Sequence, residues 1–166
     1  RPHDAGGLDH QRAVALEHFV QALRAPTETP WLLGGDAAGA ADLDARLARS
    51  GPWATCKALS LQQLLAVVYE RWPEAAAAAQ AMAPIGHALH GMSHEHWFHL
   101  LDGLALVNAL DPHGPGATGD VRARLASIEH FVAARITSNP DYDPSLCVAR
   151  ALGARVDRDP HRAIAE

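Results

Sequence analysis

The stretch WATCKALSLQQLLAVVYER, from Trp53 to Arg71, decides the fold that this sequence predicts. Its apolar residues recur at helical spacing, but they form two stripes on separate faces of the helix. The first stripe contains Leu61, Leu64, Leu65 and Val68, and the second contains Cys56, Leu59 and Val67. Only a narrow polar sector around Gln62 remains. A helix with two apolar faces needs neighbours on both sides, which is typical of a stack of helix pairs.

Helical periodicity continues on either side of this stretch, and no segment shows the sustained alternation of a β-strand. Pro84 is expected to kink or split one helix, and residues 111–119 are expected to form a loop. The expected helices cover residues 10–24, 42–49, 53–71, 73–91, 93–110, 120–137 and 143–153, with a last one from His161 onward. The sequence therefore predicts an all-α fold of stacked antiparallel helix pairs.

Three of these helices carry a stripe that is expected to face inward. The stripes are Leu16, Phe19, Val20 and Leu23; Trp97, Leu100, Leu101 and Leu104; and Val121, Leu125, Ile128, Val132 and Ile136. The pentapeptides LEHFV (16–20) and IEHFV (128–132) are nearly the same, but no constant period accompanies them. Helix pairs that diverge in sequence while sharing a packing rule fit better than an exact internal duplication.

Composition narrows the class of protein. Ala and Leu dominate the 48% of hydrophobic residues, and aromatics are only 5%, which favours closely packed helices over a β-sandwich. The net charge of −5 and the lack of a basic run argue against nucleic-acid binding. No apolar stretch is long enough for membrane insertion. Cys56 and Cys147 stand alone in the sequence, so a cytoplasmic location is expected.

We divide the chain into an N-terminal helix with a Gly/Pro-rich connection, residues 1–40, and a helical-repeat domain, residues 41–166. The chain begins with Arg1 and ends at Glu166 inside an expected helix, which indicates a fragment of a longer polypeptide. A trimmed small protein is the alternative, since chain ends are commonly disordered.

Three segments together resemble a known family. They are YERWPEAAAAAQAM (69–82), HWFHLLDGLALVNAL (96–110) and NPDYDPSLCVARALGARVDRDPHRAIAE (139–166). Their order is similar to the tetratricopeptide-like helical-repeat region of large bacterial signalling proteins, and to arrays in ATPase-linked transcriptional regulators. The resemblance covers roughly residues 42–166, although Arg71-Trp72 stands where that family usually has Gly-Asp.

The resemblance implies a non-enzymatic scaffold in a bacterial signalling or transcription-regulatory protein, with no cofactor and no catalytic residue carried over. In that family kinase-like and ATPase domains precede the repeats, and sensory or histidine-kinase domains can follow. The partner would be another protein or a neighbouring domain of the same polypeptide, although the sequence does not show which helix face would form the binding groove.

The alternative function is a helical metal-binding protein. Five histidines fall between residues 87 and 99, and His87, His90 and His94 would share one face of an unbroken helix. Gly91 and Ser93 predict a break that would scatter them, in which case they are solvated residues around a turn. His99 lies between Glu95 and Asp102, which favours a helical ion pair.

Other chemistry is absent from the sequence. It contains no GxxxxGK(S/T) phosphate loop, no GxGxxG after a strand, no HExxH and no GxSxG pattern. Gly34-Gly35-Asp36 is interpreted as a loop rather than an anion cradle. The sequence therefore favours an interaction scaffold over an enzyme.

Overall fold

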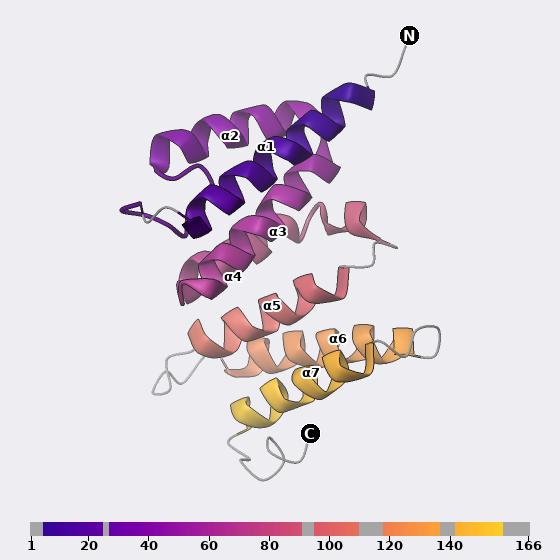
Figure 1. Cartoon of the computed structure of the whole chain (residues 1–166). Helices are drawn as coiled ribbons and strands as arrows, with labels where there is room; N and C mark the ends of the chain where they lie inside the picture. Colours follow the sequence, from indigo (N-terminus) through magenta and orange to yellow (C-terminus); the bar gives the residue numbers. More distant parts are fainter. Residues whose placement is uncertain (1–4, 25–26, 91–94, 110–117, 137–141, 158–166) are drawn as a thin grey trace. The chain divides into compact units, whose positions relative to one another are not determined.

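The computed structural model of the chain describes residues 5–24, 27–90, 95–109, 118–136 and 142–157 (Figure 1). Every regular element formed by these residues is a helix, which confirms the all-α prediction. The chain divides into two compact units, residues 1–91 and 92–166. Among the described helices, none combines the length and apolarity needed to cross a bilayer.

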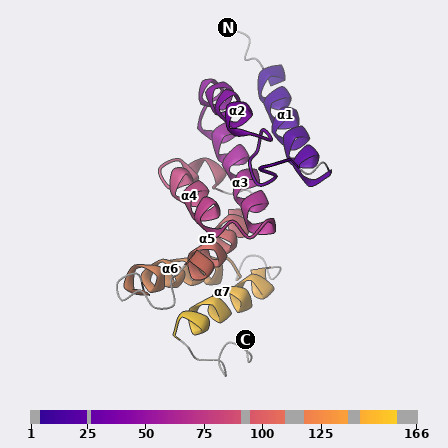
Figure 2. The ribbon, with the colours of Figure 1, turned by 90° about the vertical axis from the view of Figure 1, so that its left-hand side faces the viewer.

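Unit 1 consists of α1 (Ala5–Arg24), α2 (Ala37–Ser50), α3 (Pro52–Val68), α4 (Trp72–Met82) and the short 3-10 helix η1 (Gly86–Leu89). α3 is central to it, since α1 and α2 pack on one side and α4 and η1 on another. Figure 2 shows α1 and α4 on different sides of α3. Helix α2 runs across residues 40 and 41, where the sequence was divided.

The two faces of α3 are buried in different ways. Ala54, Ala58 and Leu65 join an apolar cluster with α1 and α2. On the opposite face Cys56 is fully buried, and its thiol donates a hydrogen bond to the Ile85 carbonyl over 3.1 Å. Burial raises the pKa of this thiol. The expected burial on two sides is therefore present, although Val68 of the predicted first stripe is exposed.

The turn between α3 and α4 is tight and contains no glycine. The Arg71 amide donates to Ala66 O and the Glu70 amide to Val67 O, the hydrogen-bond pattern of a Schellman motif. Glu70 takes the left-handed position at φ 55°, where glycine is usual. Pro73 occupies the first turn of α4, as predicted, and α4 ends before Pro84.

The start of unit 1 differs from the prediction at two helix ends. α1 begins at Ala5, five residues before the expected start at residue 10. α2 begins five residues earlier than expected because the Asp36 carboxylate accepts a hydrogen bond from the Gly39 amide over 2.7 Å. That carboxylate satisfies one of the free N–H groups at the helix start.

Unit 2 consists of α5 (Glu95–Ala109), α6 (Thr118–Ile136) and α7 (Asp143–Val156), each packed on the other two. The predicted α6 stripe is confirmed, since Val121, Leu125, Ile128 and Val132 are buried and Ile136 packs beside them. The expected inward position of Trp97 is wrong: it is 60% exposed, and Phe98 is buried instead. The helix expected from His161 lies outside the described residues, as does most of the 111–119 loop.

Gly103 brings α5 close to both of its neighbours. A Cβ at this position would lie 3.2 Å from methyl carbons of Leu125 on α6 and Leu152 on α7. It would also lie 3.4 Å from Ile128. A larger residue would therefore force the three side chains apart.

Candidate functional site

The histidines of the metal-binding alternative do not share one helix. α4 ends at Met82, His87 lies exposed in η1, and His90 follows with an extended backbone at φ −57° and ψ 130°. His94 lies outside the described residues. Within the part of the chain that the structure describes, no group of three or more His, Cys, Asp or Glu residues is arranged to hold a metal ion.

The two remaining histidines of this segment lie on α5 against aromatic rings. The His96 ring lies 4.4 Å from the Tyr142 ring, and the His99 ring lies 4.1 Å from that of Phe131, between centroids. These contacts place both imidazoles at helix–helix junctions of unit 2.

The carboxylates that flank His99 pair with arginines of α6. Asp102 accepts from Arg124 Nε at 2.8 Å, and Glu95 lies 3.4 Å from Arg135 Nη2. Both carboxylates are buried. Burial raises the pKa of Asp102, and the Arg124 guanidinium opposes that shift. These ion pairs lie between α5 and α6, and the sequence spacing on α5 alone did not predict them.

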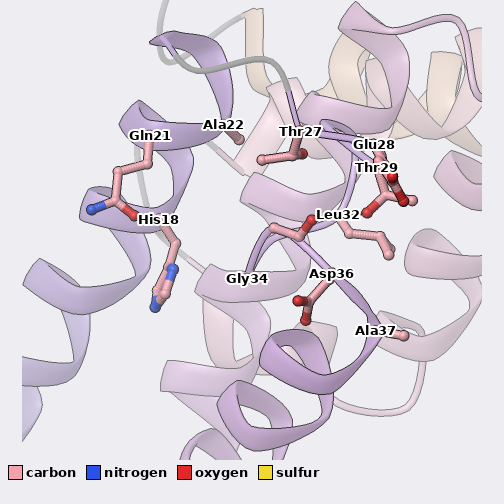
Figure 3. Close-up of a pocket in the computed structure, with 11 residues that line it drawn as sticks. His18, Gln21, Ala22, Thr27, Glu28, Thr29, Leu32, Gly34, Asp36 and Ala37 are labelled. Carbon is pink, nitrogen blue, oxygen red and sulfur yellow. Dashed lines mark hydrogen bonds between the residues drawn. The ribbon is translucent and has the colours of Figure 1, made fainter.

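A groove of about 760 Å³ lies in unit 1 between α1, the 27–35 loop and the start of α2 (Figure 3). In Figure 3, His18 and Gln21 of α1 lie across from the loop residues. The lining also includes Thr27, Glu28, Thr29, Leu32, Gly34 and Asp36. The volume is that of a small-molecule pocket, but most of the lining residues are partly or fully exposed.

The loop that forms this groove is held by the Gln62 side chain of α3 and by its own turns. The Gln62 amide donates to Trp31 O and accepts from the Leu33 amide, so it fastens the loop to α3. The interpretation of Gly34-Gly35-Asp36 as a loop is confirmed. Both glycines are left-handed, and a Cβ at Gly39 would lie only 2.4 Å from Gly34 O.

The groove is lined by hydrogen-bonding side chains and by the carboxylates of Glu28 and Asp36. No hydrogen bond joins His18 to Thr27 or Thr29, and the Thr29 hydroxyl donates to Gly35 O over 2.9 Å. A nucleophile needs a base within hydrogen-bond reach, and the described lining residues include no such pair.

α1 exposes an apolar face, which we call the α1 stripe: Leu16, Val20 and Leu23. These side chains are 52%, 40% and 48% exposed, so the inward position predicted for these three residues is wrong. α1 packs inward through Ala15 and Ala22, with Phe19 partly buried beside them. Two alanines seven residues apart were the sequence signal for this face, because small residues let helices approach closely.

The α1 stripe contrasts with the matching pentapeptide of α6. Leu16 and Val20 correspond to Ile128 and Val132, which are 1% and 0% exposed in unit 2. The same residue pattern is therefore covered by neighbouring helices in α6 and exposed in α1.

No protein-family model, curated protein or solved structure matches the chain.

Proposed function

We propose that this chain is a non-enzymatic interaction module of a bacterial signalling or transcription-regulatory protein. It binds another protein, or a neighbouring domain of the same polypeptide, through its helical surface. The observation that carries this proposal is the exposed α1 stripe, with three large apolar side chains at 40–52% exposure on one helix face. Single exposed apolar residues are ordinary, whereas several on one face are typical of a surface that another protein covers.

We further propose that the helices belong to a tetratricopeptide-like stack. The burial of α3 on two opposite faces supports this architecture, as does the tight turn that joins α3 to α4. A stack of this kind buries a continuous core and leaves its terminal helices with a face for a further neighbour. The apolar outer face of α1 is consistent with such a position.

Site-specific photocrosslinking in the native host tests the interaction. A benzophenone amino acid replaces Val20 in one version of the full chain and Gln80, an exposed residue of α4, in the matched control. Mass spectrometry then identifies proteins joined to each version. We expect a defined protein adduct with the position-20 version. Its yield should be at least about tenfold higher than with the position-80 version, the ratio that 1.4 kcal/mol of binding free energy produces.

Equal labelling at the two positions would count against the α1 stripe as a binding surface. A second comparison adds Leu16→Glu and Leu23→Glu to the position-20 version, since carboxylates on both sides of the crosslinker should prevent apolar docking. An adduct that survives these changes would mean that the crosslinker reports proximity rather than binding.

A further inference from the structure

The matching pentapeptides indicate what kind of element would cover the α1 stripe. In unit 2, Val132 of α6 packs against Tyr142 and Leu146, at the start of α7. Beside this apolar contact, Glu129 of α6 pairs with Arg150 of α7, with Nε and Oε1 3.0 Å apart. The pentapeptide of α6 therefore receives a helix that supplies apolar side chains and an arginine.

The α1 pentapeptide has the same requirements. Leu16 and Val20 stand where α6 has Ile128 and Val132, and Glu17 stands where α6 has Glu129. Glu17 is exposed, and its hydrogen bond from Gln21 is long, at 3.3 Å. By this comparison, the element that covers α1 is a helix with an apolar stripe and an arginine near Glu17.

α1 itself meets this description. Arg24 is exposed and follows Glu17 by seven residues, which is two helical turns, so both charges lie along the same flank of the α1 stripe. In an antiparallel pair related by a two-fold axis near Val20, Leu16 of one copy meets Leu23 of the other. The same axis brings Glu17 of each copy to Arg24 of its partner, because an isologous contact pairs each residue reciprocally.

We propose that the α1 stripe is a self-association surface on which α1 of a second copy lies antiparallel. The proposal rests on the proposed function as an interaction module, and it names the partner as this same chain. The region from Leu16 to Arg24 spans only about 13 Å of helix at 1.5 Å per residue. The contact is therefore small, and we expect a weak, reversible dimer.

Sedimentation velocity of the purified full chain over a hundredfold range of concentration measures this association. We expect a monomer–dimer equilibrium that Val20→Glu weakens by at least about tenfold, since it places two carboxylates at the axis. The matched control is Val148→Glu on α7, where the valine is similarly exposed at 46%. It should leave the equilibrium unchanged. Circular dichroism confirms that both variants remain helical, since glutamate is a good helix former.

Charge reversal tests the antiparallel arrangement. Glu17→Arg and Arg24→Glu should each weaken the dimer several-fold, because each creates two like-charge pairs across the axis. The double variant exchanges the two charges and should restore the wild-type equilibrium. Restoration by the double variant is specific to this pairing and would not follow from general changes in helix stability.

Three results would overturn self-association at this surface. They are a chain that stays monomeric at every concentration, a dimer that tolerates Val20→Glu, and a double charge variant that is no closer to wild type than the single variants. A monomeric chain that still forms an adduct with a different protein at position 20 would leave the proposed function intact. Crosslinks to its own copies alone, together with a dimer sensitive to Val20→Glu, would support self-association.

Discussion

Two adjacent glutamines of α3 have opposite surroundings. Gln63 is fully buried, and neither of its amide atoms has a hydrogen-bond partner among the described residues. Gln62 instead bonds to the backbone of Trp31 and Leu33. A buried polar group without a partner lowers stability by about 1–3 kcal/mol, whereas a satisfied one contributes about 1 kcal/mol per bond.

Replacing each glutamine with methionine, which has a similar volume, should therefore change stability in opposite directions. We expect Gln63→Met to raise the free energy of unfolding by about 1–3 kcal/mol, and Gln62→Met to lower it by about 1–2 kcal/mol. Urea unfolding followed by circular dichroism measures both. A loss of stability in Gln63→Met would mean that its amide has a partner in solution, such as a bound water.

Replacing each of two glycines of unit 2 with alanine should also change stability in opposite directions. Gly103→Ala should lower stability by about 1 kcal/mol, because crowding against Leu125 and Leu152 outweighs the better helix propensity of alanine. Gly153 lies inside α7, and a Cβ there would meet no atom within 4 Å. Gly153→Ala should therefore raise stability by up to about 1 kcal/mol. Thermal unfolding of the two variants separates the effect of crowding from that of propensity.

Between elements, the burial of Asp102 at the contact of α5 with α6 makes stability depend on pH. Burial raises the pKa of Asp102 above its ordinary value of 3.8, so the folded state binds this proton more tightly than the unfolded state. Its contribution to stability is then largest at low pH and falls as pH rises from about 3.8 through the raised pKa. The pKa shift of Glu74 has the opposite sign, because the hydrogen bond from Arg71 lowers its pKa. The contribution of Glu74 to stability is therefore largest at higher pH.

Urea unfolding from acid to neutral pH tests this difference. As pH rises, wild type should lose stability relative to Asp102→Asn and gain stability relative to Glu74→Gln. The pair is informative because the two carboxylates lie in different units and are expected to give slopes of opposite sign. If the unfolding free energies of wild type and Asp102→Asn changed with pH in parallel, burial would not control the pKa of this carboxyl.

The helices also differ in how far their burial follows from the sequence. α6 was predicted well because its stripe packs on neighbours along one face. The packed face of α1 is not predicted, because periodicity identifies an apolar face but does not show whether a neighbour covers it. The buried residues of that face are alanines, with Phe19 partly buried beside them. The break between α3 and α4 is predicted, but the left-handed conformation of Glu70 within it is not, since a non-glycine residue in that conformation has no local signal. The ion pairs of α5 and α6 depend on how the helices pair, which local spacing does not reveal.

At the scale of the whole molecule, each unit has its own apolar core. One cluster joins Leu43, Leu47 and Leu65 in unit 1, and another joins Leu125, Ile128 and Leu152 in unit 2. We expect fragments 1–91 and 92–166 each to fold alone, with a stability of about 3–5 kcal/mol, the usual limit for a core of this size. Circular dichroism and cooperative urea unfolding measure this. A fragment that stays unfolded would show that its core needs the other unit.

The buried thiol of Cys56 allows a direct measurement of how often α3 and α4 separate. This side chain has no solvent exposure, its pKa is raised, and Cys147 in the other unit is only partly buried. A thiol-specific alkylating reagent should therefore label Cys147 first, and it should reach Cys56 only when this helix pair opens. The labelling rate of Cys56 divided by that of Cys147 would report local opening of unit 1 with no cysteine introduced. The Gln63→Met variant should lower this ratio, because it is expected to stabilise the unit.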